Sequence, residues 1–398
     1  MNEKPRIAHV LYRLDTGGME QIVVTLINQT CQHYHHAVIC LEGFSAFRER
    51  IEDPDVPCVA LHKQPGKDWG CYIRLFKALK DFKPDLVQTY NIGAIDAVAI
   101  ARLAGVRRIV HAERGRDASD PRGESRKYRY LRRWLAPWID RYLAVSGELE
   151  GWLTGKVGID PSRIVRIPNG VDVSRFISAL RKKTVRPLLG AFAPPGTVLV
   201  GTVGRLDPVK DQLGLLSAFD RLRDLLPMER ERLRLVIIGE GKQRSELEAR
   251  ISHLGLGGQV GMLGNRSDIA ALLAEFDIFA LSSVAEGMSV TLLEAMATRL
   301  PVVATAVGGT SEVVLPGETG ILVPASNPQE LAQALAGYVM DETLRVRHGV
   351  AGRLRVETQF SLSAMVSAYT ALYDELLSDS TRYPQTAVEP RVAGHRER

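Results

Sequence analysis

Short apolar runs alternate with longer polar–apolar segments along most of the chain. The runs in the first half are "RIAHVLY", "HHAVIC", "DLVQTY", "RRIVHA", "RYLAVS" and "RIVRIP". Those in the second half are "TVLVGTVG", "LRLVIIG", "QVGMLG", "DIFALS", "PVVATA" and "GILVPA". Near-continuous apolar strands separated by helical patterns are typical of parallel sheets that helices cover on both faces. The pattern therefore predicts an α/β fold.

The intervening segments have apolar residues at helical spacing. They predict helices over residues 19–29, 69–82, 95–104, 212–226, 244–253, 269–275 and 289–298. Two sets of alternating strands and helices indicate two doubly wound domains. We expect a first domain over residues 1–175 and a second over 197–359. The charged, then Pro- and Gly-containing stretch 176–196 is the expected linker, and 379–398 lack periodicity and are an expected disordered tail.

Composition bounds the class of protein. The chain has 398 residues, 45% of them hydrophobic, and a net charge of +5. Seven basic and two acidic residues lie between Arg122 and Arg141, so this stretch alone accounts for the net charge. One local basic surface argues against a nucleic-acid binder.

No apolar run approaches the roughly 18 residues of a membrane span. The start, "MNEKPRIAHVLYRL", has no signal-peptide h-region, and the four cysteines form no C-x-x-C pair. We therefore expect a cytoplasmic protein.

Two glutamates eight positions apart follow one of the buried strands. In "DIFALSSVAEGMSVTLLEAMAT", Glu286 comes after the strand and Glu294 lies in the next helix. Ligands bind at the carboxyl ends of strands in doubly wound sheets, and helix N-termini favour anions. The stretch predicts a phosphate site between two carboxylates, which suits a sugar–diphosphate–ribose ligand. The alternative is a helix-dipole contact for Glu286 and a solvated Glu294. The expected donor-binding residues between them are Gly287, Met288, Ser289, Val290 and Thr291.

Two cations follow the first strand of the second half. In "GTVGRLDPVKD", Arg205 comes after the strand and Lys210 five residues later. Both could contact one diphosphate, Arg205 through a bidentate fork and Lys210 as a point charge. Two surface cations near the start of a helix are the alternative.

Glycines and one further arginine complete the expected donor site. Gly17 and Gly18 lie between the first strand and the first helix, where they permit either close backbone approach to a ligand or a tight turn. Gly239 begins an incomplete dinucleotide fingerprint, whose third glycine position is Arg244. That departure disfavours an NAD-dependent dehydrogenase. Arg266, after "QVGMLG", is also expected at the donor.

Several motifs together resemble one enzyme family. They are "E-G-x-x-x-x-x-x-E-A-M-A", "P-V-V-A-T-x-x-G-G-x-x-E-V-V", "G-x-T-G-x-L-V-P", "V-G-R-L-x-x-x-K", "I-P-N-G-V-D" and "G-G-M-E". In combination they resemble the retaining family 4 glycosyltransferases, which have the two-domain GT-B fold. Within that family, "ERGRD" and "AVSGELEGWL" resemble sugar transferases of the PEP-CTERM/exosortase exopolysaccharide system.

The resemblance implies a nucleotide-diphosphate-sugar donor and a glycan or lipid-linked acceptor, without a metal or other cofactor. It assigns the donor diphosphate to Arg205, Lys210 and Gly18, the donor sugar to Glu286 and the ribose to Glu294. It also implies that a helix over residues 360–378 crosses back to the first, acceptor-side domain.

One segment departs from the family pattern. Many members have "V-H-T-x-H-G" after a strand of the first domain, whereas this chain has "V-H-A-E-R-G". His111 is kept, but Arg114 occupies the position of the second histidine. We expect Arg114 to contact a sugar, with His111 or Glu113 as other candidates for the role. The alternative is that Arg114 pairs with Glu113 or Asp117 in a surface loop.

No carboxylate is clearly placed as a nucleophile, so we expect front-face retaining transfer in which the leaving phosphate helps to deprotonate the acceptor. The rivals are a GT-B nucleotide-sugar epimerase and a non-catalytic nucleotide-sugar-binding protein.

The basic stretch 122–142 is a candidate membrane-surface helix. Leu131, Trp134, Leu135 and Trp138 fall on one helical face, with cations beside them. The alternative is an ordinary helix with that apolar face in the core and a solvated basic face.

Overall fold

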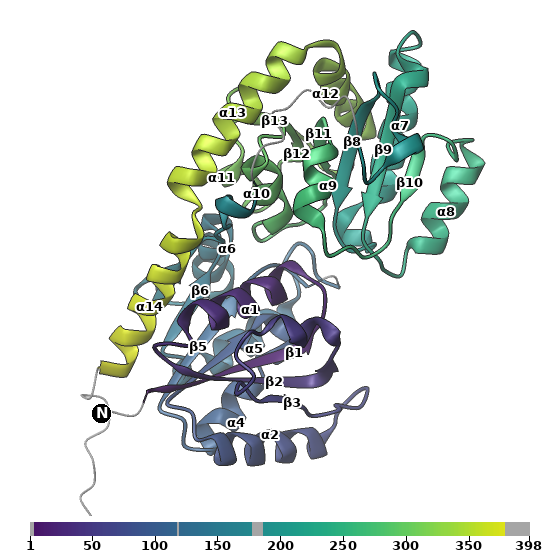
Figure 1. The fold of residues 1–398 in the computed structure, drawn as a ribbon. Coiled ribbons are helices and arrows are strands. Elements are labelled where there is room, and N and C mark those ends of the chain that lie inside the picture. Colours follow the sequence, from purple (N-terminus) through teal and green to yellow (C-terminus); the bar gives the residue numbers. More distant parts are fainter. Residues whose placement is uncertain (1–3, 118, 177–185, 379–398) are drawn as a thin grey trace, which may run out of the picture.

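The structure, a computed structural model, describes residues 4–117, 119–176 and 186–378, which form two parallel-sheet domains (Figure 1). The first sheet has seven strands in the order β3-β2-β1-β4-β5-β6-β7, and the second has six in the order β10-β9-β8-β11-β12-β13. The predicted α/β architecture of two doubly wound domains is therefore confirmed. The strands are β1 (Arg6–Leu14), β2 (His35–Phe44), β3 (Cys58–Ala60), β4 (Leu86–Tyr90), β5 (Arg108–Glu113), β6 (Arg141–Ala144), β7 (Ile164–Arg166), β8 (Val198–Val203), β9 (Leu233–Ile238), β10 (Val260–Met262), β11 (Ile278–Leu281), β12 (Val302–Thr305) and β13 (Gly320–Val323).

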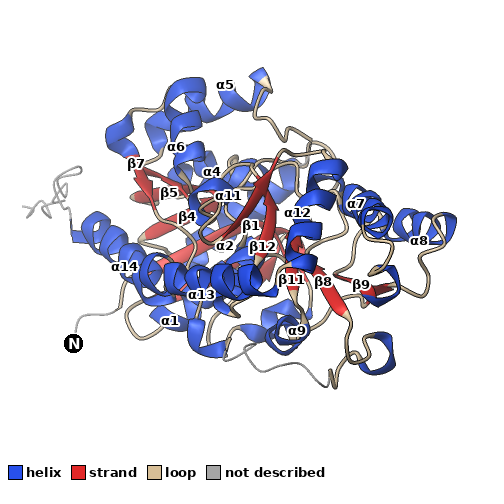
Figure 2. Cartoon of the chain, turned by 90° about the horizontal axis from the view of Figure 1, so that it is seen from above, coloured by secondary structure: helices blue, strands red, loops and turns tan. Residues whose placement is uncertain are grey.

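Helices cover both faces of the sheets (Figure 2). In the first domain they are α1 (Gly18–Thr30), α2 (Trp69–Phe82), α3 (Asn91–Ala94), α4 (Ala97–Leu103), α5 (Arg126–Leu135) and α6 (Gly147–Trp152). In the second they are α7 (Gln212–Leu225), α8 (Arg244–His253), α9 (Ile269–Glu275), α10 (Val290–Ala297), α11 (Thr310–Val313) and α12 (Pro328–Met340). The long α13 (Glu342–Gln359) and α14 (Leu362–Ser378) follow.

All twelve predicted strands are present, and most predicted helices end within one or two residues of the observed bounds. The sequence missed β3, whose three residues are too few to show periodicity. The helix expected over 95–104 is observed as α4 (Ala97–Leu103), and the sequence missed the short α3 that precedes it.

The strand order places the loops that matter for a ligand. The order reverses beside β1 in the first sheet and beside β8 in the second, since β1 pairs with both β2 and β4, and β8 with both β9 and β11. Ligands of doubly wound sheets bind outside the carboxyl ends of strands at such reversals. The loops after β1, β5, β8 and β11 are therefore the first places to look for a site.

The helix expected over 360–378 begins at Leu362, because the chain breaks between α13 and α14 against the first domain. The Val171 N–H donates to the Phe360 carbonyl (3.0 Å), and the Leu362 N–H donates to the Val171 carbonyl (3.0 Å). A Cβ on Gly170 would lie only 2.6 Å from the Ser361 carbonyl oxygen, so this close contact needs glycine. The "I-P-N-G-V-D" motif thus fixes the point at which the long helices pass from the second domain to the first.

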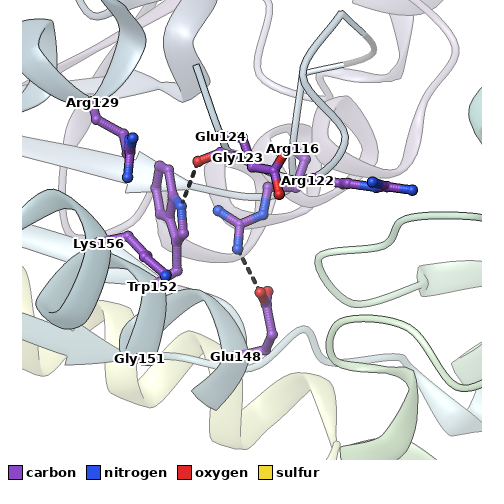
Figure 3. Close-up of a pocket in the computed structure, with 9 residues that line it drawn as sticks. All are labelled: Arg116, Arg122, Gly123, Glu124, Arg129, Glu148, Gly151, Trp152 and Lys156. Carbon is purple, nitrogen blue, oxygen red and sulfur yellow. Dashed lines mark hydrogen bonds and ion pairs between the residues drawn. The ribbon is translucent and has the colours of Figure 1, made fainter. Parts of the chain in front are cut away.

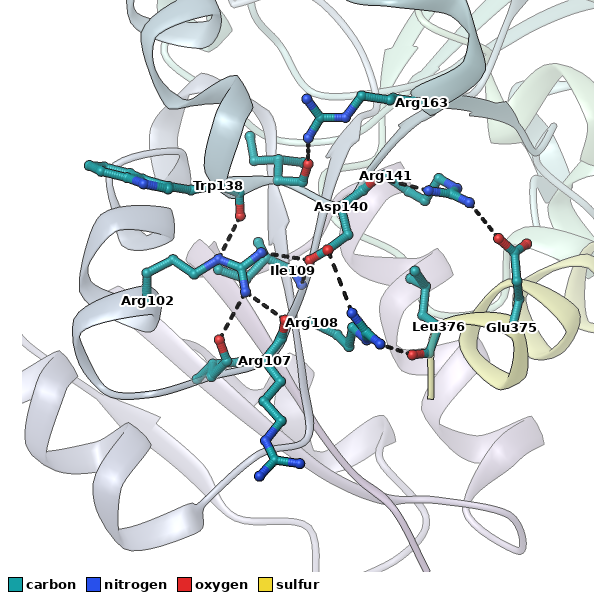
Figure 4. Close-up of polar contacts among 12 residues, drawn as sticks. Arg102, Arg107, Arg108, Ile109, Trp138, Asp140, Arg141, Arg163, Glu375 and Leu376 are labelled. Atoms are coloured by element: carbon teal, nitrogen blue, oxygen red, sulfur yellow. Dashed lines mark hydrogen bonds and ion pairs between the residues drawn. The ribbon is translucent and has the colours of Figure 1, made fainter. Parts of the chain in front are cut away.

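The far end of α14 is bonded to β5 and β6 (Figure 4). The Arg108 Nε–H donates to the Leu376 carbonyl (2.7 Å), and the same guanidinium lies 4.0 Å from the Asp140 carboxylate. Arg141 pairs with Glu375 at 2.5 Å. These contacts anchor α14 on the first domain, as expected for a crossover helix.

Much of the predicted linker packs against the second domain. Arg186 donates to the Glu275 carbonyl (3.0 Å) and pairs with Asp277 at 2.5 Å. Residues 177–185 of the linker and the tail over 379–398 lie outside the described residues.

The basic helix α5 differs from the ordinary core helix that was one of the two expected arrangements. Leu135 is buried, but Tyr130 and Trp134 are 68% and 65% exposed, and Trp138 is 39% exposed in the 3-10 turn that follows. Arg132 is buried instead of flanking the surface. The prediction of one apolar face packed wholly in the core was therefore wrong. In the described part of the chain no helix is long and apolar enough to cross a membrane.

Candidate active site between the two domains

Where the two domains meet, glycine residues allow the backbone of one domain to approach the other closely. A Cβ on Gly287, in the loop between β11 and α10, would lie 2.1 Å from the Arg114 carbonyl oxygen after β5. A Cβ on Gly18 would lie 3.5 Å from Val290 Cγ2 at the start of α10. The loops after β1, β5 and β11 therefore converge. We expected Gly287 to give a ligand access to the backbone, but here it admits the backbone of the other domain.

Arg114 links three segments at this junction. It is 8% exposed, and its guanidinium donates to the Tyr369 hydroxyl of α14 (2.6 Å) and to the Asn169 side-chain oxygen. The Asn169 amide in turn donates to the Met288 carbonyl of the second domain (2.8 Å). Arg114, Asn169 and Tyr369 are called the Arg114 cluster below. The alternative of a surface-loop pair with Glu113 or Asp117 is wrong.

His111 lies beneath the cleft in a buried polar chain. Its ring is 0% exposed, with Nδ1 bonded to Thr89 Oγ1 (2.7 Å) and Nε2 to Glu113 Oε1 (3.1 Å). Arg132 of α5 forms a bidentate pair with Glu113. Burial alone would raise the pKa of Glu113, but Arg132 and His111 outweigh it and hold the pKa well below its usual range. His111 thus presents no surface to the cleft, and the geometry favours Arg114 over His111 as a residue that could act there.

Lys210 and Glu286 form the charged centre of the second domain's side. Lys210 Nζ lies 2.6 Å from Glu286 Oε1, and the Ser283 hydroxyl donates to the same oxygen (2.6 Å). The Lys210 and Glu286 side chains are 22% and 8% exposed. The loops after β8 and β11, 76 residues apart in sequence, therefore supply one ion pair. A bound anion could share the lysine while the carboxylate keeps hydroxyl-accepting capacity.

Arg205 is exposed and faces an acid from the other domain. Its guanidinium makes no hydrogen bond or ion pair with any described residue, so this group is available to a ligand. Burial raises the pKa of Glu20, in the first turn of α1, and the nearby Arg205 and Arg114 charges act in the opposite direction. Glu20 therefore belongs to the cleft. Sequence analysis missed it, although it is the last residue of the "G-G-M-E" motif.

The N-terminus of α10 lies beside this cluster. Ser289 caps the helix by accepting from the Leu292 N–H (3.3 Å). The first amides of a helix have no intrahelical acceptor, so those near Val290 and Thr291 can bind an anion. The expected site from Met288 to Thr291 is thus assembled at the domain junction.

Glu294 sits one turn deeper in α10. Burial raises its pKa to about 7, and the positive charges of Arg175 and Arg50, both from the first domain, partly offset this effect. The carboxylate therefore faces the first domain and not bulk solvent.

The other expected donor residues have structural partners. A Cβ on Gly17 would overlap the Glu20 carboxylate (2.2 Å), and one on Gly239 would meet the Gly204 carbonyl (2.0 Å). Arg266 forms a two-bond pair with Asp268 (2.8 and 2.6 Å) in the loop before α9. None of these contacts joins Arg266 to the Lys210–Glu286 pair.

The part of the chain that the structure describes contains no group of three or more His, Cys, Asp or Glu side chains that could hold a metal ion.

Comparisons with known proteins match both halves of the chain. The model described as "Glycosyltransferase Family 4" matches residues 16–175, and "Glycosyl transferases group 1" matches residues 191–355.

Two curated relatives cover most of the chain. One is the Escherichia coli UDP-Gal:alpha-D-GlcNAc-diphosphoundecaprenol alpha-1,3-galactosyltransferase, 30% identical over 70% of this chain and 73% of the relative. The other is the lipopolysaccharide core biosynthesis mannosyltransferase LpcC of Rhizobium leguminosarum bv. viciae, 30% identical over 64% of this chain and 70% of the relative.

A structural neighbour supports the fold. Anabaena HepE in complex with UDP-glucose aligns with a TM-score of 0.79, at 22% identity, over 94% of this chain and 99% of the neighbour. With the two facing sheets, this similarity confirms the predicted GT-B fold.

The Arg114 cluster yields a first prediction. Arg114→Ala should lower turnover at least tenfold and the free energy of unfolding by about 2–4 kcal/mol, because it leaves buried polar partners without a charge-assisted bond. Arg114→Lys keeps the charge without the two-sided fork, so it should fold better and still lose turnover. Steady-state kinetics and urea unfolding measure both effects. The control is exposed Arg107→Ala. Full activity in a folded Arg114→Ala protein would contradict the prediction and return the role to His111.

The raised pKa of Glu294 yields a second prediction. Because the folded protein holds this proton more tightly than the unfolded chain, stability from this group is present below about pH 4.5 and is lost as pH rises to about 7. Glu294→Gln should therefore be more stable than the parent at pH 8, by on the order of 1–3 kcal/mol, and similar at pH 4.5.

Urea unfolding at both pH values measures this difference, with exposed Glu318→Gln as the charge-matched control. Calorimetry with nucleoside diphosphates should also show weaker nucleotide binding in Glu294→Gln than in Glu286→Gln. If the free energy of unfolding depended on pH in the same way in the parent and in Glu294→Gln, the raised pKa of Glu294 would be refuted.

Proposed function

The chain belongs to glycosyltransferase family 4, and on this premise we propose that it transfers a sugar from a nucleotide-diphosphate sugar to a glycan or lipid-linked acceptor, with retention at the anomeric carbon. The observation that carries the proposal is the 2.6 Å Lys210–Glu286 pair beside the N-terminus of α10, with unpaired Arg205 nearby. These groups suit a diphosphate and the sugar attached to it.

The proposed chemistry is metal-independent front-face transfer. The bond between the anomeric carbon and the diphosphate oxygen breaks, and a bond to the acceptor oxygen forms on the same face. The acceptor proton passes to the leaving diphosphate. Arg205, Lys210 and the amides from Met288 to Thr291 would stabilise the negative charge that develops on the leaving group.

Residues on both sides of the cleft would hold the remaining parts of the substrates. Glu286 would accept hydroxyl bonds from the donor sugar and Glu294 from the ribose, with Gly18 beside the diphosphate. Arg114 would orient the donor or acceptor sugar in place of the family's usual histidine. Its rigid support by Asn169 and Tyr369 suits such a role, since a locked side chain loses little freedom on binding.

We also propose the setting of the reaction. The E. coli relative is named for a diphosphoundecaprenol acceptor and the Rhizobium relative for lipopolysaccharide core synthesis, which supports a role in exopolysaccharide or other cell-surface glycan synthesis. The motifs "ERGRD" and "AVSGELEGWL" resemble those of the PEP-CTERM/exosortase-associated group, which supports the same setting. The enzyme would work in the cytoplasm, at the inner face of the membrane.

The surface of α5 supports membrane attachment. Tyr130, Trp134 and Trp138 are exposed, and the Trp134 and Trp138 rings lie 5.3 Å apart. Exposed cations, including Arg126, Lys127 and Arg133, lie on the same helix. Aromatic rings at the headgroup level and cations on anionic lipid bind a membrane surface reversibly.

A direct assay tests the proposed reaction. Incubation with a panel of nucleotide sugars should release nucleoside diphosphate in an acceptor-dependent manner. Arg205→Ala and Lys210→Ala should each lower turnover by on the order of 100-fold, because a group that stabilises the leaving charge is lost. Arg221→Ala, an exposed site on α7, is the control. Isomerised donor without an acceptor would indicate an epimerase, and binding without turnover a non-catalytic protein.

Vesicle co-sedimentation tests the membrane surface. The protein should bind anionic but not neutral vesicles, with binding that falls as salt rises. A Trp134→Ala, Trp138→Ala double variant should bind several-fold more weakly, whereas Met228→Ala, which removes a 93% exposed side chain of the second domain, should not. Binding that ignores lipid charge would rule out the electrostatic mechanism.

A further inference from the structure

A positively charged cavity opens in the first domain between the loop after β5, α5 and α6 (Figure 3). Its volume is about 330 Å³. Four cations line it, Arg116, Arg122, Arg129 and Lys156, against two acids, Glu124 and Glu148. No residue assigned to the donor belongs to this cavity, which is called the basic pocket below.

The wall of the basic pocket is a buried tryptophan. Trp152 is 7% exposed, and its indole N–H donates to the Gly123 carbonyl (3.0 Å), which fixes the ring. The Arg116 guanidinium carbon lies 4.1 Å from the ring centroid, and that of Arg132 lies 4.9 Å away. Stacking on a fixed ring holds Arg116 in one orientation before any ligand binds.

Arg116 has an unsatisfied donor group. Its side chain is only 8% exposed, and Nη2 is paired with Glu148 at 2.5 Å. Nη1 is buried and has no hydrogen-bond partner among the described residues. A buried N–H group without an acceptor costs free energy, and the cation–π contact with Trp152 offsets part of that cost.

Unlike Arg116, the other three cations of the pocket have no acidic partner among the described residues. Within the described ranges, the structure gives no ion pair to Arg122, Arg129 or Lys156. Figure 3 shows Arg129 and Lys156 near the Trp152 ring and Arg122 pointing away from it. Four cations against two acids leave the lining with a net charge of +2, which favours a multiply charged anion.

The basic pocket lies beside the cleft. Glu148 pairs with Arg116 through its side chain. Its backbone N–H donates to Glu312 Oε1 of the second domain (3.3 Å). Gly115, the neighbour of Arg116, lies against Gly287, since its Cβ would be 3.6 Å from the Gly287 nitrogen. The basic pocket therefore lies next to the junction of the two domains, on the side of the first domain.

We propose that the basic pocket binds the phosphate or diphosphate group of the acceptor. The proposal rests on the proposed glycosyl transfer and names the acceptor class, a glycan carried on a phosphate or diphosphate. Arg129 and Lys156 neutralise the charge of this group, beside Arg116, which Trp152 and Glu148 hold in place at the pocket's wall. A volume of about 330 Å³ accommodates a diphosphate with part of the sugar attached to it.

Inorganic pyrophosphate is the probe, in a background that lacks the donor diphosphate site. In the Arg205→Ala, Lys210→Ala protein, calorimetry at low ionic strength should still show one pyrophosphate bound per chain. Adding Arg129→Ala and Lys156→Ala should weaken this binding at least tenfold. Adding Arg126→Ala and Lys127→Ala, which removes two exposed cations outside the pocket, should change it less than twofold. Thermal unfolding checks that each variant is folded.

Absence of pyrophosphate binding in the background protein would overturn the proposal, as would equal losses in the two double variants. Equal losses would instead indicate diffuse attraction to α5. The proposed glycosyl transfer is checked separately, because nucleoside diphosphate binding to the Arg129→Ala, Lys156→Ala protein should stay within about twofold of the parent. If the parent binds no nucleotide, glycosyl transfer fails while the pyrophosphate result still stands.

An acceptor comparison gives the second readout. Relative to the parent, the Arg129→Ala, Lys156→Ala protein should have a KM at least tenfold higher for a diphosphate-linked acceptor. Its KM for a neutral glycan of the same sugar should be nearly unchanged. If the parent enzyme preferred the neutral glycan, or a glycan that carries only a carboxylate, the assignment of the basic pocket to the acceptor phosphate would be overturned.

Discussion

The buried Arg114 cluster is the interaction on which the relation between the two domains depends. One guanidinium joins the end of β5 to Asn169 and to Tyr369 of α14, and Asn169 reaches across to the Met288 carbonyl. A buried arginine is stable only when its donors are satisfied, and here the acceptors come from segments far apart in sequence. The loop that would bind the donor is thus held by the same bonds that hold the crossover helix. A shift that separates the second domain from this cluster must break the Asn169–Met288 bond.

The charges in the cleft fall into three kinds. Some are already paired, as Lys210 is with Glu286, so their positions are set before a ligand binds. Others, such as Arg205, have no partner in the described part of the chain and must find one in the ligand. Paired groups supply geometry, while unpaired ones supply attraction. Glu294, whose pKa burial raises to about 7, belongs to a third kind, since its charge depends on pH near neutrality.

The basic stretch of the first domain serves several purposes at once. Arg132 is in the core as the partner of Glu113, Arg129 faces the basic pocket, and Arg126 and Lys127 are exposed to solvent. The number of basic residues in this stretch is therefore larger than the number that could contact a membrane surface. The same helix that presents Trp134 outward also forms part of the pocket, so membrane attachment would bring the pocket toward the bilayer.

The sequence alone determined the architecture, because strand periodicity and the motifs at strand ends are local properties. Twelve strands, the roles proposed for Glu286 and Lys210, and the pairing of two doubly wound domains all follow from it. The sequence could not show that Gly287 faces the other domain, because that contact joins residues 173 positions apart, counted from Arg114. Nor could it show that Arg114 is buried and His111 inaccessible, since burial depends on what packs above a strand. The division of the α5 cations among core, pocket and surface was likewise decided only by tertiary packing, where a 3-10 turn after Leu135 ends the helical periodicity.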